Sequence, residues 1–106
     1  MTTSISRLFQ ALQIVAGRYL KCGFSMTSGD RSCDRQRQVS TSRTSHHVNG
    51  TAFDAVVVPW DPRKQAQLGA LAEHWGYRWG GNFKTGDYAN DVVHFDDGRR
   101  FRAGNC

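Results

Sequence analysis

Apolar residues near the start of the chain recur every three or four positions, which is the spacing of an amphipathic helix. These positions are Ile5, Leu8, Phe9, Leu12 and Val15. Ser4 comes directly before them and is a candidate N-cap. The pattern predicts a helix over residues 5–18, and Gly23 then introduces a short strand over residues 24–27.

A second helix is predicted after a buried strand in the middle of the chain. Residues 52–58 form a short apolar run with several β-branched residues, ended by Pro59, which is typical of a strand. Asp61 and Pro62 then suit the N-cap and the first position of a helix that Gly76 ends. The apolar face predicted for this helix comprises Leu68, Leu71, Ala72 and Trp75.

Shorter elements complete the predicted fold. Residues 77–79 and 92–95 have the composition of strands, and the polar stretch over residues 28–45 contains a helical turn at residues 34–39. Helices and strands do not alternate strictly. We therefore expect a small α+β domain over residues 1–106, in which a mainly antiparallel sheet of about four strands is packed with two to three helices.

The composition suits one globular unit. Of the 106 residues, 39% are hydrophobic and 11% aromatic, which is enough for a modest core and too much for a disordered chain. No apolar run approaches the roughly 20 residues that span a bilayer, so membrane insertion is not expected. The first twenty residues contain no small-residue cleavage site, which predicts that there is no signal peptide.

The chain is basic, with 14 Lys and Arg against 9 Asp and Glu and a formal net charge of +5. A basic protein is attracted to polyanions, which include nucleic acids, anionic lipids and the acidic polymers of a bacterial wall. The arginines are spread along the chain rather than gathered in one block. Charge alone therefore does not choose among these partners.

The three cysteines, Cys22, Cys33 and Cys106, include no CxxC pair, so cysteine is not expected to bind a metal. Because no export signal is predicted, reduced thiols are expected. A Cys22–Cys33 bridge is the alternative.

Two segments far apart in sequence carry candidate chemistry. Residues 45–54 contain His47 and end with Asp54 at the head of an apolar strand, and His94 interrupts a second apolar strand. Imidazole and carboxylate groups are the ligands of catalytic zinc sites, which keep three protein ligands and an open position for water. Two adjacent strands would place Asp54 and His94 on one face, and a glycine-containing turn would return His47 to the same point. A satisfied structural role for each of these polar residues is the competing interpretation.

A nearby carboxylate that is not a ligand would serve as the base in such a site. Asp91 comes three residues before His94, a spacing that puts the two side chains on opposite faces of a strand. Asp91 must therefore lie on a turn that enters the strand. His46 is expected at the surface or beside the ligands, and Asp96 and Asp97 are expected in a turn before Gly98.

Four segments in order resemble the family of zinc D-alanyl-D-alanine carboxypeptidases and phage L-alanyl-D-glutamate peptidases. They are Thr27-Ser28-Gly29-Asp30-Arg31-Ser32, Ser45-x-His47-x-x-Gly50-x-Ala52-x-Asp54, Gly76-Tyr77-Arg78-Trp79-Gly80-Gly81 and Asp91-x-x-His94-Phe95. Together they span nearly the whole predicted fold. The resemblance implies the fold of these zinc peptidases and cleavage of peptidoglycan stem peptides.

The resemblance also implies roles for single residues. It implies Zn²⁺ ligands at His47, Asp54 and His94, with Asp91 as the catalytic base. Arg31 is implied to face the substrate, since a guanidinium can stabilise a developing oxyanion. Ser45 is implied to hold the ligand loop by hydrogen bonding, and Trp79 and His46 to lie near the ligands or the substrate.

The sequence departs from the family pattern at Asp30, which replaces the usual aromatic residue and could draw Arg31 into a local ion pair. The segment between Arg31 and Ser45 is also short and rich in Arg and Gln, so part of the usual substrate wall is expected to be missing.

Two other classes of protein stay open. A non-catalytic metal-binding module would be expected to lack the base, yet Asp91 is present. A His-Asn-His nuclease is suggested by His46, His47 and Asn49, but His94 is too distant in sequence.

We therefore expect a monomeric, zinc-dependent peptidase of peptidoglycan, most like an endolysin that cuts the L-Ala–D-Glu bond. A D-Ala–D-Ala carboxypeptidase is the alternative within the family. No nucleic-acid partner is expected. The absence of a predicted signal peptide favours a protein that stays in the host cytoplasm until lysis releases it to the cell wall in the periplasm.

Overall fold

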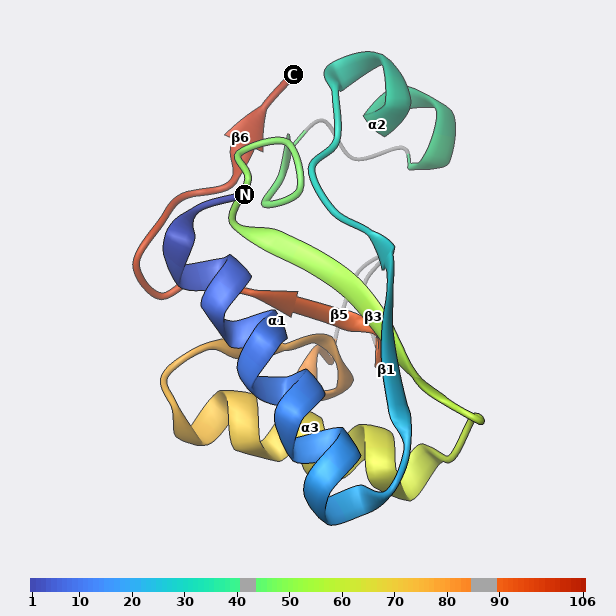
Figure 1. Cartoon of the computed structure of the whole chain (residues 1–106). Coiled ribbons are helices and arrows are strands. Elements are labelled where there is room, and N and C mark those ends of the chain that lie inside the picture. Colours follow the sequence, from blue (N-terminus) through green and yellow to red (C-terminus); the bar gives the residue numbers. More distant parts are fainter. Residues whose placement is uncertain (41–43, 85–89) are drawn as a thin grey trace.

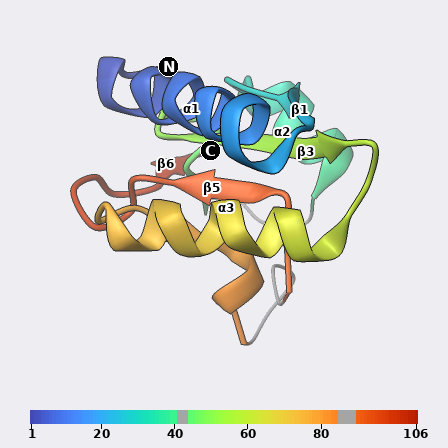
Figure 2. The ribbon, with the colours of Figure 1, turned by 60° about the horizontal axis from the view of Figure 1, so that its bottom comes forward.

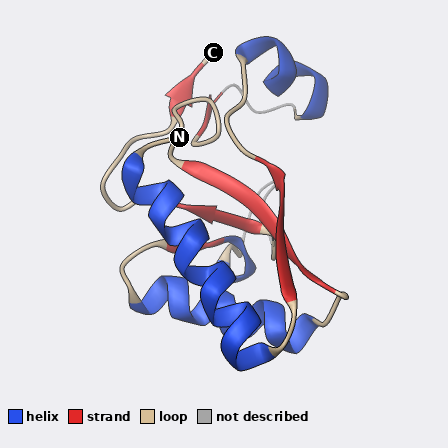
Figure 3. Cartoon of the chain, in the orientation of Figure 1, coloured by secondary structure: helices blue, strands red, loops and turns tan. Residues whose placement is uncertain are grey.

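The computed structural model describes residues 1–40, 44–84 and 90–106. Its helical segments are α1 (Thr3–Val15), the π-helical η1 (Ala16–Leu20), α2 (Cys33–Val39), α3 (Pro62–His74) and the 3-10 turn η2 (Gly80–Asn82). Its strands are β1 (Gly23–Ser28), β2 (Thr44–Ser45), β3 (Ala52–Val58), β4 (Arg78–Trp79), β5 (His94–Asp96) and β6 (Gly104–Asn105). Figure 3 shows these helices and strands along the chain. The predicted α+β class is confirmed.

A four-stranded antiparallel sheet in the order β1-β3-β5-β4 forms the centre of the molecule. A second, two-stranded sheet pairs β2 with β6. Figure 1 shows β6, α2 and both chain termini at one end of the central sheet. Among the described residues, no helix is both long enough and apolar enough to cross a bilayer.

The central sheet has one face in the hydrophobic core. Successive side chains of a strand point to opposite faces, so Phe53, Ala55 and Val57 of β3 share a face. All three are buried together with Phe95 of β5. The core also includes Ile5, Leu8 and Leu12 of α1 and Leu68 and Ala72 of α3. Figure 2 shows α1 and α3 alongside β3 and β5. The opposite face carries the even-numbered residues of β3.

Helix α3 is joined to the sheet by a buried glutamine that the sequence pattern did not single out. The Gln65 side chain is 1% exposed. Its amide nitrogen donates to the carbonyl oxygens of Ala55 and Val92, and its Oε1 accepts from the backbone nitrogen of Val57. The side chain therefore satisfies backbone groups of β3 and of the turn before β5.

Several predicted boundaries require correction. The first helix is capped by Thr2, whose hydroxyl accepts from the backbone nitrogen of Ile5, whereas Ser4 bonds to Tyr77 and Asp97 instead. The strand predicted over residues 92–95 is β5, which begins at His94, because the backbone nitrogen of His94 bonds to the carbonyl oxygen of Asp91 and closes a turn.

The prediction for α3 is mostly confirmed. Asp61 caps the helix by accepting hydrogen bonds from the backbone nitrogens of Arg63 and Lys64. Gly76 ends it with φ of +91°. Trp75 was wrongly assigned to the buried face, since it is 39% exposed at the helix C-cap.

The cysteine prediction is wrong. Cys33 and Cys106 form a disulfide between residues 73 positions apart, while Cys22 is free. Neither reduced thiols throughout nor a Cys22–Cys33 bridge describes the structure. The bond connects α2 to the C-terminus, a contact between chain segments that no spacing rule in this sequence indicated. Part of the polar stretch, residues 41–43, lies outside the described residues.

Candidate metal centre

The three predicted ligand residues meet on the face of the central sheet opposite the core. Asp54 of β3 and His94 of β5 are direct partners in the antiparallel register. Because directly opposed residues share a face, their side chains lie together. His47 reaches the same point from the loop before β3, where Gly50 has φ of +71° and the backbone nitrogens of Gly50 and Thr51 bond back to His47 and His46.

The three potential donor atoms have the spacing of metal ligands. His47 Nε2 lies 3.1 Å from Asp54 Oδ1, His94 Nδ1 lies 3.2 Å from His47 Nε2, and His94 Nδ1 lies 3.4 Å from Asp54 Oδ1. Ligands about 2.0–2.1 Å from a tetrahedral zinc are separated by about 3.3 Å. Two imidazoles and one carboxylate in this arrangement fit a zinc ion, and the described residues supply no fourth ligand to close the cage.

Each imidazole is oriented by a hydrogen bond on its other nitrogen. His47 Nδ1 donates to the carbonyl oxygen of Gly29 at 2.9 Å, which leaves Nε2 for the metal. His94 Nε2 donates to Asp96 Oδ2 at 2.8 Å, which leaves Nδ1 for the metal. Partners of this kind fix the tautomer and direction of metal-binding histidines. Ser45 Oγ accepts from the backbone nitrogen of His47 at 3.1 Å, the loop contact expected of it.

The charges around the site support a negatively charged Asp54. Burial raises the pKa of the Asp54 carboxyl, but hydrogen bonds with His47 and His94 outweigh it and hold the pKa well below its usual value. Burial lowers the pKa of His94, whereas the carboxylates of Asp54 and Asp96 raise it to about 9. A metal ion would replace that proton, because ligands bind in their deprotonated form.

Asp91 meets the condition set by its spacing from His94. It lies in the turn that enters β5, and its carbonyl oxygen accepts from the His94 backbone nitrogen at 3.0 Å. Burial, followed by the negative charge of Asp54, raises the pKa of the Asp91 carboxyl. A half-buried carboxyl with a raised pKa beside the metal ligands is suited to exchange a proton.

Arg31 lies on the other side of Asp54. Its Nη2 is 3.7 Å from Asp54 Oδ2, and its Nη1 donates to Oε1 of the fully buried Gln36 at 2.8 Å. The local pair with Asp30 considered from the sequence is absent among the described contacts, because Asp30 pairs with the N-terminal amine at 2.6 Å. The guanidinium is therefore held at the metal centre.

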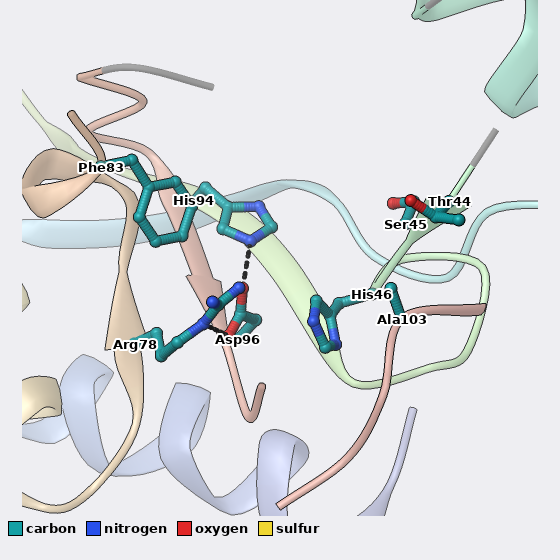
Figure 4. Close-up of a pocket in the computed structure, with 8 residues that line it drawn as sticks. All are labelled: Thr44, Ser45, His46, Arg78, Phe83, His94, Asp96 and Ala103. Atoms are coloured by element: carbon teal, nitrogen blue, oxygen red, sulfur yellow. Dashed lines mark hydrogen bonds and ion pairs between the residues drawn. The ribbon is translucent and has the colours of Figure 1, made fainter. Parts of the chain in front are cut away.

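A cavity of about 200 Å³ adjoins the metal centre through His94. Figure 4 shows His94, Phe83 and Arg78 on one side of it and His46, Ser45 and Ala103 on the other. His46 Nδ1 lies 2.9 Å from Thr51 Oγ1, and burial lowers the pKa of its imidazole. His46 therefore presents a neutral ring to this cavity.

Trp79 lies on the core face, opposite the ligands. It pairs with Phe95 in the sheet, and its indole nitrogen donates to the carbonyl oxygen of Val92 at 2.7 Å. This hydrogen bond supports the turn between Asp91 and His94, and the partly buried Trp79 packs against the hydrophobic core.

Sequence reasoning missed Asp96, which was assigned to a turn with Asp97. Both residues are 0% exposed, and Asp96 belongs to β5. The His94-Phe95-Asp96 alternation was the available signal, because residues two apart in a strand share a face.

The chain is similar in sequence and in structure to known proteins. The model of the peptidase M15 family matches residues 1–96. The structure of Serratia marcescens L-Ala D-Glu endopeptidase ChiX is 27% identical, with a TM-score of 0.62, and the match covers 91% of this chain and 87% of that one.

A second similar fold is that of a variant of VanY, a vancomycin resistance D,D-pentapeptidase from the VanB-type cassette, in complex with Zn(II). It has a TM-score of 0.71 at 16% identity and covers 91% of this chain and 71% of that one. No curated protein sequence matches the chain significantly. The family match covers the whole central sheet and every residue of the metal centre. The chain therefore belongs to the peptidase M15 family.

Proposed function

We propose that this chain is a zinc-dependent hydrolase of peptidoglycan stem peptides, of the endolysin type, that cuts the L-Ala–D-Glu bond. The observation that carries the proposal is the convergence of His47 Nε2, Asp54 Oδ1 and His94 Nδ1 within 3.4 Å of one another. Two imidazoles and a carboxylate with an open side are the ligand set of catalytic zinc rather than of structural zinc.

The similarity to ChiX supports the choice of substrate. That protein is an L-Ala D-Glu endopeptidase, and the match covers most of both chains at 27% identity. The likeness to VanY, at 16% identity, supports the fold alone. We therefore favour the L-Ala–D-Glu bond over a terminal D-Ala bond.

The residues around the site suit hydrolysis of an amide. A bound zinc would supply a Lewis acid that polarises the scissile carbonyl and lowers the pKa of water. Asp91 would accept the proton of the attacking water and pass it to the leaving amine. Arg31, held by Gln36, would donate to the oxygen on which negative charge develops.

The cavity beside His94 would receive one side of the cleaved peptide. Its walls combine the apolar Phe83 and Ala103 with the polar side chains of Ser45 and His46 and with the Arg78–Asp96 ion pair. Binding pockets hold a ligand by apolar contact and fix its orientation with a few placed polar groups. A stem peptide, which carries alanine methyl groups beside polar amides and carboxylates, fits that description.

We propose that the protein acts at the cell wall, after release from the host cytoplasm. Disulfides persist in oxidising compartments and are rare in the cytosol. The Cys33–Cys106 bond is therefore consistent with a site of action outside the cytoplasm.

The decisive experiment compares zinc binding and wall hydrolysis in two variants. Asp91→Asn should retain zinc and lose hydrolysis by about 10²–10⁴-fold, the contribution of general base catalysis. His94→Ala should lose both. Asp34→Asn, an exposed residue of α2, is the matched control and should match the unsubstituted chain. An active Asp91→Asn enzyme would remove the base assignment, and an unsubstituted chain without zinc-dependent hydrolysis would overturn the function.

Mass spectrometry of the released muropeptides identifies the bond. Products with a free D-Glu amino group support the proposed endopeptidase. Loss of a terminal D-Ala would instead identify a carboxypeptidase.

A further inference from the structure

We propose that Asp96 and Arg78 are positioning residues that set the zinc affinity of the site by holding His94 with Nδ1 toward the metal. This inference rests on the metal-binding role of His94 in the proposed function. It adds two residues that are not metal ligands. Asp96 bonds to His94, and Arg78 bonds to Asp96.

The strand geometry places Asp96 behind the ligand. His94 and Asp96 are two apart in β5 and share a face, while Phe95 between them points into the core. His94 Nε2 donates to Asp96 Oδ2 at 2.8 Å. Figure 4 marks this interaction with a dashed line. With its proton on Nε2, the imidazole has its lone pair on Nδ1, the atom that lies 3.2 Å from His47 Nε2.

Arg78 fixes the carboxylate in turn. It is the direct partner of Asp96 in the β4–β5 register, and it forms a bidentate pair in which Nε donates to Oδ1 at 2.7 Å and Nη2 to Oδ2 at 2.8 Å. The backbone nitrogen of Gly98 donates to Oδ1 at 2.8 Å. Bidentate arginine–carboxylate pairs constrain direction as well as distance.

The resulting arrangement accepts only an ionised carboxylate. Both oxygens of Asp96 receive donors, from Arg78, Gly98 and His94. An asparagine of the same shape would turn an NH₂ group toward one of these donors. If that group faced His94, Nε2 would become the acceptor and the proton would move to Nδ1, where it opposes a cation.

A purely structural ion pair between β4 and β5 is the competing explanation. Buried ion pairs contribute little net stability, because desolvation offsets their attraction. Asp96 is 0% exposed, and it also accepts a hydrogen bond from the imidazole ring of His94, whose other nitrogen faces the metal site. His47 uses an uncharged backbone carbonyl for the same purpose, so His94 is the imidazole whose basicity is increased by a carboxylate.

The test measures the dissociation constant for zinc alone, by competition with a chelator, in the folded whole chain. Asp96→Asn should weaken zinc binding about 10–100-fold, the usual effect of losing such a partner. Arg78→Lys, which keeps the charge but loses the bidentate geometry, should weaken it less. Cobalt-substituted Asp96→Asn should show an altered visible absorption spectrum, which a loss of stability alone would not produce.

Asp97→Asn is the matched control. Asp97 is equally buried and adjacent, but its contacts are to Ser4 and Arg100 rather than to His94. It should bind zinc as tightly as the unsubstituted chain. If folded Asp96→Asn also keeps the original affinity and cobalt spectrum, the positioning proposal is overturned while the zinc site stands. If the unsubstituted chain binds no zinc, the proposed function fails first. Should Asp96→Asn not fold, unchanged affinity in Arg78→Lys overturns the proposal.

Discussion

Gly80 lies directly against Asp91, so that a Cβ at Gly80 would overlap the backbone carbonyl oxygen of Asp91. The same Cβ would come within 3.0 Å of His94 Cβ. The turn that presents the proposed base to the metal centre therefore packs directly against the backbone of Gly80, where there is no room for a side chain. Trp79, the preceding residue, supports this turn through the carbonyl oxygen of Val92.

Gly80→Ala should reduce both stability and activity. The methyl group displaces backbone rather than a flexible side chain, so the turn holding Asp91 must shift, at a cost of about 1–3 kcal/mol. A displacement near 1 Å lowers the rate about 100-fold. Urea unfolding and wall-lysis rates measure the two effects. Gly17→Ala is the control, since nothing lies within 4 Å of a Cβ there. Equal behaviour of the two variants would contradict this account.

Cys33→Ser should destabilise the protein more than Cys22→Ser does. The disulfide closes a loop of 73 residues, and the chain-entropy model assigns such a loop about 4 kcal/mol. Cys22 is unbridged and serves as the control. Urea unfolding without reductant measures the difference. A midpoint for Cys33→Ser equal to that for Cys22→Ser would show that the bond contributes nothing.

Arg31→Lys should lower kcat/KM by about 10²–10³-fold, the usual loss of one oxyanion donor. The guanidinium uses one nitrogen to donate to Gln36 while its other nitrogen lies beside Asp54. A lysine ammonium, a single point charge, cannot make both contacts in this geometry. Zinc affinity should change little. Arg35→Lys, on the exposed side of α2, is the control, and hydrolysis of a defined stem peptide is the measurement. Full activity in Arg31→Lys would exclude a role in the reaction.

The stabilisation that zinc adds should vary with pH in the opposite direction to the stability of the metal-free chain. Because the pKa of His94 is raised to about 9, its proton stabilises the metal-free chain below about pH 6.5 and is lost as the pH rises through 9. Zinc competes with that proton, so apparent zinc affinity should tighten up to about tenfold per pH unit below 9. Melting temperatures in chelator and in zinc, from pH 6 to about 9.5, measure both trends. A zinc-induced increase that does not vary with pH would contradict the assignment.

The sequence predicted best where one local rule decided the structure. The β-branched run of β3, the Asp61 cap and the Gly76 stop each follow from residues close in the chain. The metal centre was also predictable, because a period of two places Asp54 and His94 on one face once their strands pair.

The features that were missed depend on contacts between distant segments. The Cys33–Cys106 bond joins ends of the chain that no spacing rule connects. Asp96 resembled a turn residue because its partner Arg78 is 18 positions away, and only the β4–β5 register brings the two together. The beginning of β5 was misplaced because Val92 and Val93 have strand-forming side chains but lie in a turn closed by the Asp91 carbonyl.

The alternation along β3 and β5 has a consequence for redesign of this protein. Phe53 and Phe95 stack at 5.2 Å on one face and hold the two strands together, while Asp54 and His94 occupy the other. Replacing side chains on the polar face leaves that aromatic contact in place. The sheet can therefore serve as a scaffold on which a different cation, or a different bond specificity, is introduced without rebuilding the interior.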